Sequence, residues 1–87
     1  MILAINSNNQ PITVDAFFAA YSEFSENHRL AEQTSRFLKV LQRHPHNPEV
    51  IASKVLDDFV FTVSGNNRTY DVYFEISGTN VLLKAIK

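Results

Sequence analysis

Histidines and paired carboxylates are the side chains of this 87-residue chain whose chemistry we consider first. His44 and His46 stand two positions apart, on either side of Pro45. Two such histidines can share a metal ion, but no nearby cysteine or carboxylate completes a recognisable ligand spacing. Asp57 and Asp58 are adjacent, and adjacent carboxylates at the end of a short helix point in different directions, so they do not share a proton. We therefore predict no metal site, no cofactor and no carboxylate dyad.

Motifs for covalent catalysis and for phosphate binding are missing from the sequence. The chain has no cysteine, which excludes thiol nucleophiles, thiolate zinc ligands and disulfides. It has no glycine-x-serine-x-glycine turn to expose a nucleophilic serine, and no glycine-rich loop after a strand to hold a phosphate. We therefore predict that the protein is not an enzyme.

A basic stripe follows one predicted helix. Arg29, Arg36 and Arg43 are seven residues apart, with Lys39 close to them. Such a stripe can bind a phosphate backbone or an acidic protein surface. Glu32 lies four residues before Arg36 and is placed to pair with it, and the net charge of the chain is −1, which argues against general affinity for nucleic acid. We predict that Arg36 and Arg43 instead steer a protein partner.

The first half of the chain predicts a strand and three helices. Met1–Ile5 reads as a short strand that ends at a turn-forming cluster. Thr13 is placed as the N-cap of a first helix and Asn27 as that of a second, which ends before Pro45 because proline disfavours helical geometry in the preceding residue. Asn47, followed by a proline, starts a short third helix that ends at the adjacent aspartates. The buried stripes consist of Val14, Phe17, Phe18, Tyr21 and Phe24 in the first helix, and Leu30, Thr34, Phe37, Leu38 and Leu41 in the second.

From Phe59 onward the apolar period changes from 3.6 to 2, which predicts strands. Two-residue turns at Asn66–Asn67 and at Gly78–Thr79, the second of type II′, would connect three of them. This register places apolar residues opposite one another on one face of the sheet. The predicted pairs are Val63 with Tyr70, Phe61 with Val72, Phe59 with Phe74, Ile76 with Val81, Phe74 with Leu83, and Val72 with Ala85.

Together these elements predict one α+β domain over residues 1–87. It has two layers, with an N-terminal strand, two to three helices and a C-terminal three-stranded antiparallel meander. The helices cover one face of the sheet, and the N-terminal strand joins the sheet because alone it could not bury its side chains. No stretch approaches the roughly 20 apolar residues that cross a bilayer, and the apolar start is too short for a signal peptide. We therefore expect a cytoplasmic protein without a membrane partner.

The second face of this predicted sheet is neither plainly polar nor plainly apolar. In the predicted register Tyr73 lies opposite Lys84, with Leu82 and Ile86 on either side. The face is covered either by the N-terminal segment or a loop, or by a partner, which includes a second copy of the chain. We predict that Tyr73, Leu82 and Ile86 are apolar anchors for a partner, with Lys84 between them. The remaining residues of this face are Val60, Thr62, Asp71 and Glu75.

Residues 61–76, together with the helices before them, resemble the RelE/HigB group of ribosome-dependent RNase toxins. Members of that group have a strand, two helices and an antiparallel sheet whose lysines and arginines act on the scissile phosphate. The sheet positions of this chain that are candidates for those lysines and arginines hold Thr62, Asp71, Glu75 and Leu82. The resemblance implies an RNase toxin-type domain that would instead use the arginines Arg29, Arg36, Arg43 and Arg68.

The sequence thus favours a non-enzymatic macromolecule-binding protein that docks on a protein partner, as inhibitors, immunity proteins and antitoxins do. Two alternatives stay open: the RNase toxin-type domain, and a homodimeric scaffold domain that meets its own copy across the sheet. No catalytic constellation is visible, and amphipathic surfaces remain on the sheet and on the second helix.

Overall fold

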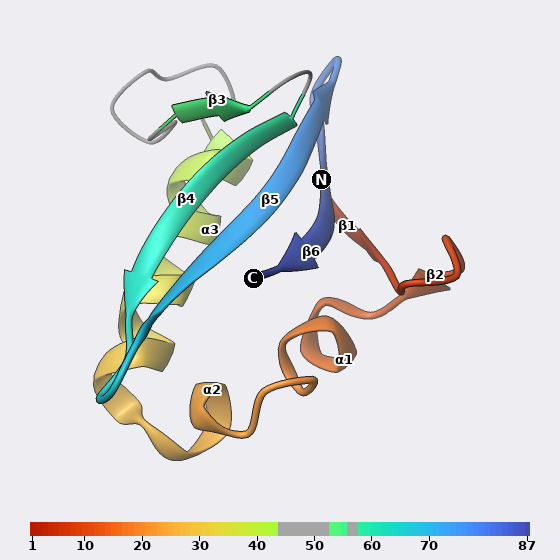
Figure 1. Ribbon diagram of the computed structural model, residues 1–87. Coiled ribbons are helices and arrows are strands. Elements are labelled where there is room, and N and C mark those ends of the chain that lie inside the picture. Colours follow the sequence, from red (N-terminus) through yellow and green to blue (C-terminus); the bar gives the residue numbers. More distant parts are fainter. Residues whose placement is uncertain (44–52, 56–57) are drawn as a thin grey trace.

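Three helices lie on one face of a six-stranded mixed sheet in the computed structural model, which describes residues 1–43, 53–55 and 58–87 (Figure 1). The strand order is β2-β1-β6-β5-β4-β3, with β1 and β6 parallel and the other neighbouring pairs antiparallel. This arrangement confirms the α+β class. The elements are β1 (Ile2–Ile5), β2 (Pro11–Ile12), α1 (Val14–Phe18), α2 (Glu23–Glu26), α3 (His28–Arg43), β3 (Ser53–Val55), β4 (Asp58–Ser64), β5 (Thr69–Ser77) and β6 (Asn80–Ile86).

The predicted meander is present as β4, β5 and β6. Phe61 lies opposite Val72, and Phe74 lies opposite Leu83, as predicted. The Gly65 N–H donates to the Arg68 carbonyl over 2.8 Å and closes the first loop. In the second loop Gly78 has a φ of +61°, which glycine adopts without the steric cost of a Cβ. Residues 59–63 and 70–76 therefore alternate between the two faces as the sequence predicts.

Two predicted pairs, Val72 with Ala85 and Tyr73 with Lys84, are wrong. A β-bulge interrupts the pairing of β5 and β6 between Tyr73 and Phe74, so Tyr73 lies opposite Ala85 and Val72 lies opposite Ile86. Two residues of β6, Lys84 and Ala85, thus stand where β5 has one. Because side chains alternate along a strand, this extra residue reverses the face of every later side chain.

The first predicted helix is broken into two. Thr13 is its N-cap as predicted, since its hydroxyl accepts from the Ala16 N–H over 3.0 Å. α1 ends at Phe18, and tighter three-residue turns follow, in which Tyr21 N–H donates to the Phe18 carbonyl and Phe24 N–H to the Tyr21 carbonyl, each over 3.2 Å. These turns bring the Phe24 ring to 5.1 Å from that of Phe18, so aromatic packing decides the break.

The second predicted helix is confirmed as α3. Its N-cap is Asn27, whose side-chain oxygen accepts from the Leu30 N–H over 3.2 Å. Leu30, Thr34 and Leu41 are buried, and they hold α3 against the sheet. The buried Thr34 hydroxyl donates to the Leu30 carbonyl over 2.9 Å, which satisfies it within the helix.

The prediction of a third helix is wrong for the part of that segment that the structure describes. Ser53–Val55 forms strand β3, which pairs with the start of β4 from Val55 opposite Asp58 to Ser53 opposite Val60. Pairing with β4 satisfies backbone groups that a helix would have satisfied internally. The rest of the predicted helix, at 47–52 and 56–57, lies outside the described residues.

β1 joins the sheet beside β6, and the Val81 N–H donates to the Met1 carbonyl over 2.9 Å. Strand β1 runs parallel to β6 because the chain between them passes through the helical layer and returns. The core lies between the helices and the inner face of the sheet, with Phe61, Phe74, Val72, Leu30 and Leu41 fully buried. None of the helices that the structure describes is long and apolar enough to cross a membrane.

Candidate functional site

The outer face of the sheet is the face that no helix of the described chain covers (Figure 1). Leu3 on β1 lies opposite Leu82 on β6, which lies opposite Glu75 on β5. Leu3 is 42% exposed and Leu82 is half-buried. A leucine pair thus reaches solvent on two neighbouring strands.

Tyr73 continues this apolar surface toward the other edge of the sheet. It lies between Val60 on β4 and Ala85 on β6, and its side chain is half-buried. Val60 belongs to the same face but is only 7% exposed. Large apolar side chains open to solvent on the described part of the outer face include Leu3, Leu82 and Tyr73, which we call the outer patch.

Charges of both signs lie beside and between the residues of the outer patch, since Glu75 is opposite Leu82 and two residues from Tyr73. Lys84 Nζ lies 3.7 Å from a Glu75 carboxylate oxygen, and Lys87 Nζ lies 5.0 Å from the centre of the Tyr73 ring. The Thr62 hydroxyl donates to Asp71 Oδ1 over 2.7 Å. Apolar and charged side chains thus lie next to one another on this face, and protein interfaces contain both kinds.

The structure brings only half of the predicted partner-binding residues together. Tyr73, Leu82 and Lys84 share the outer face. Ile86 does not, because the bulge turns it to the inner face, where it packs against the core beside Val72. The prediction that Ile86 is an anchor on the outer face is therefore wrong.

The predicted steering charges lie in the other layer of the molecule. Arg36 and Arg43 are exposed on α3, which packs its apolar stripe on the inner face and thus turns its charged stripe away from the sheet. Glu32 was predicted to pair with Arg36, but its Oε1 lies 3.2 Å from Nε2 of His28. A partner seated on the outer patch would therefore not reach these arginines by direct contact.

A polar cluster that was not predicted from the sequence joins the helices to the first hairpin. The Glu23 carboxylate accepts from the Tyr70 hydroxyl at 2.7 Å, from the Asn27 side-chain amide at 2.8 Å, and from the Asn66 backbone N–H at 2.7 Å. We call Glu23, Asn27, Asn66 and Tyr70 the clasp. Glu23 and Asn27 are far in sequence from Asn66 and Tyr70, and the four residues carry no motif, so only the tertiary fold reveals the clasp.

Hydrogen bonding shifts the pKa of two side chains of the clasp, Glu23 and Tyr70. The bonds from Asn27, Tyr70 and Asn66 lower the pKa of Glu23, and Arg68 lowers it further by its charge. The bond to Glu23 and burial raise the pKa of Tyr70. Both carboxylate oxygens are engaged, and a Cβ at Gly65 would stand 2.6 Å from one of them. The clasp therefore ties the helical layer to the first hairpin of the sheet.

Metal binding gains no support from the described residues. Among residues 1–43, 53–55 and 58–87, no group of three histidines, aspartates or glutamates is close enough to hold a metal ion. His44, His46 and Asp57 lie outside the described residues.

No protein-family model, curated protein or solved structure matches the chain in the comparisons. The functional interpretation therefore depends on the residues of the molecule itself.

Proposed function

We propose that this protein is a non-enzymatic binding domain that docks on a protein partner through its outer patch. The observation that carries the proposal is the contrast between the layers: the inner face is buried under helices, whereas the outer face keeps Leu3, Leu82 and Tyr73 accessible. A patch of this kind on a small domain is typical of interaction surfaces.

The charges beside the outer patch favour a protein over a nucleic acid. Glu75 and Asp71 lie beside the outer patch as near neighbours of Lys84 and Thr62. Carboxylates there would repel phosphates, whereas a protein surface can meet both signs of charge. The exposed arginines of α3 lie in the opposite layer of the molecule. They would be the basic surface of the RNase toxin-type alternative, and this surface does not extend to the outer face of the sheet.

The test begins with capture of partners on immobilised protein from a lysate of the organism that encodes it. The captured partner is then purified and its binding measured with three variants. Tyr73→Ala and Leu82→Ala should each raise the dissociation rate by about tenfold or more, because a few desolvated side chains carry most of the affinity of an interface. Thr69→Ala, exposed at the start of β5 on the same face but away from the outer patch and the charges beside it, is the matched control and should bind like wild type.

Arg36→Glu separates the docking proposal from the alternative. This variant should change the association rate constant for the protein partner by no more than about threefold. The change should vanish at high salt, because Arg36 acts only at long range. If Arg36→Glu abolishes binding to RNA while Tyr73→Ala changes nothing, the helical stripe is the functional surface and the proposal fails. Sedimentation of the free protein as a dimer that Tyr73→Ala dissociates would identify a scaffold that meets its own copy.

A further inference from the structure

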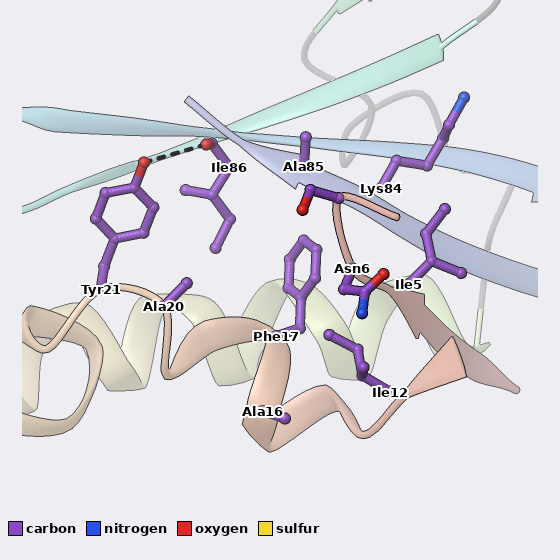
Figure 2. A pocket seen from close by; sticks show the side chains of 11 residues that line it. Ile5, Asn6, Ile12, Ala16, Phe17, Ala20, Tyr21, Lys84, Ala85 and Ile86 are labelled. Atoms are coloured by element: carbon purple, nitrogen blue, oxygen red, sulfur yellow. Dashed lines mark hydrogen bonds between the residues drawn. The ribbon is translucent and has the colours of Figure 1, made fainter. Parts of the chain in front are cut away.

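A cavity of about 390 Å³ opens where strands β1 and β6 part, over α1 and the turn that follows it (Figure 2). Its volume is within the range of about 300–1,000 Å³ typical of ligand sites. The side chains that define it are mostly apolar and come from three segments: Ile5, Ala16, Phe17, Ala20, Tyr21 and Ile86. We call this cavity the wedge.

The wedge exists because the two strands end differently. Pairing of β1 with β6 stops at Ala4 opposite Leu83. β1 then turns back at Asn6, whose N–H donates to the Gln10 carbonyl over 2.9 Å and whose side-chain oxygen accepts from two further N–H groups. β6 continues for Lys84, Ala85 and Ile86, which corresponds to about 10 Å of extended chain. Among the residues that the structure describes, β5 is the only strand that pairs with β6 along this stretch.

The backbone of Ile86 faces the wedge. Ile86 lies opposite Val72, and the next residue, Lys87, donates its N–H to the Asp71 carbonyl over 2.8 Å. In an antiparallel ladder this bond makes Ile86 and Val72 a non-hydrogen-bonded pair, so the N–H and C=O of Ile86 point away from β5. The Tyr21 hydroxyl, which reaches across the wedge, donates to that carbonyl over 3.3 Å (Figure 2).

The backbone of Ile5 faces the wedge from the other strand. Ile5 lies opposite Pro11, and Asn6 donates to Gln10, so the same rule turns the backbone groups of Ile5 away from β2 and toward β6. Pro11 has no N–H to donate, which suits a non-hydrogen-bonded position on an edge strand. The Ile5 N–H donates to the Leu83 carbonyl at the end of the parallel ladder, so the C=O of Ile5 and the N–H of Ile86 are the backbone groups that point toward the cavity.

We propose that the wedge binds an extended peptide segment of a partner protein, which adds to the edge of β6 beyond the end of β1. A strand edge recognises another strand by backbone hydrogen bonds, and an apolar pocket beside it takes every second side chain. The peptide would pair at Ile86, because by the same rule the backbone groups of Ala85 face β5, and one apolar side chain of the peptide would lie over Phe17 and Ala20. This site is separate from the outer patch and does not depend on it.

The probe is a short capped peptide that alternates valine and threonine, titrated into the isotope-labelled protein and followed by amide NMR. Saturable shifts should concentrate at Ile5, Ala20 and Ile86, and the Ile86 amide should exchange more slowly with solvent in the complex. The control peptide has the same side chains but N-methylated central amides, which cannot form the ladder. It should bind at least about tenfold more weakly, since it lacks the donors that a sheet edge requires.

Two exposed alanines of the same turn provide a matched pair of variants. Ala20 lines the wedge and Ala19 does not, so Ala20→Leu should lower peptide affinity by about tenfold or more while Ala19→Leu leaves it unchanged. Ala16→Leu, on the exposed side of α1, serves the same purpose if Ala20→Leu fails to fold. Absence of saturable shifts, equal binding of the N-methylated peptide, or equal loss in the Ala19 and Ala20 variants would each overturn the proposal.

Discussion

The two faces of the sheet differ most clearly at two neighbouring residues of β5. Phe74 points inward and is fully buried, with the rings of Phe59 and Phe61 each centred 5.8 Å away. Tyr73 points outward, is half-buried, and meets the Lys87 ammonium instead of another ring. Adjacent aromatic residues therefore have different environments because side chains alternate along a strand. The inner residue stabilises the fold, whereas the outer one is available to a partner.

Side-chain hydrogen bonds tie the helices to the edge of the inner face, whereas in the described part of the chain no helix is tied to the outer patch. The clasp ties α2 and the start of α3 to the loop between β4 and β5. Gln33 on α3 adds to it, since its side-chain amide donates to the Ser64 carbonyl over 3.3 Å and accepts from the Ser64 N–H over 3.2 Å. Closed hydrogen-bond networks of this kind rigidify a structure. Polar side chains on this domain therefore do not by themselves mark its functional surface.

The largest expected effect separates the two faces directly. Phe74→Ala should lower the free energy of unfolding by about 3–5 kcal/mol, because it leaves a cavity in a fully buried aromatic cluster. Tyr73→Ala should lower it by no more than about 1 kcal/mol, since that side chain is outside the core. Urea denaturation followed by circular dichroism measures both. Similar losses for the two variants would show that the faces are assigned wrongly.

A smaller effect concerns the clasp and depends on pH. The pKa of Glu23 is lowered from its ordinary value of 4.5, so its ionised form adds stability above that value and the contribution is lost as the pH falls through the lower, folded-state pKa. Wild type should therefore lose more stability on acidification than Glu23→Gln. Tyr70→Phe, which removes one of the three hydrogen bonds, should be intermediate.

Urea midpoints measured between about pH 6 and pH 3 provide the check, because carboxylates titrate in that interval. Identical pH dependence of wild type and Glu23→Gln would mean that the clasp does not hold an ionised carboxylate. The outer patch should be insensitive to both substitutions, so partner binding at neutral pH is the control.

Local patterns predicted much of this fold and failed where a contact distant in sequence decides the outcome. The apolar alternation after Phe59 correctly predicted the register of β4 and β5, because each residue of a buried face constrains the next. The bulge at Lys84 could not be predicted in this way, since the alternation up to Ile86 is equally apolar in either register. One extra residue was enough to move Ile86 from the predicted anchor set into the wedge.

The candidate site was predictable only in part for the same reason. Tyr73 and Leu82 precede or adjoin the bulge on their strands, and the alternation places them correctly. Leu3 was missed because the position of β1 beside β6 depends on how the chain crosses the helical layer. The clasp was missed because Glu23 and Tyr70 are 47 residues apart and meet only after α2 has turned.

The most direct test of the docking account is site-specific photocrosslinking in the native host. A photoreactive phenylalanine analogue is placed at Tyr73 on the outer patch, and in a second protein at Arg36 on the exposed side of α3. Both positions tolerate a large side chain because neither is in the core. We predict that the probe at position 73 crosslinks to one protein and that the probe at position 36 gives little or no product. Crosslinks to RNA or protein from position 36, with none from position 73, would contradict the account.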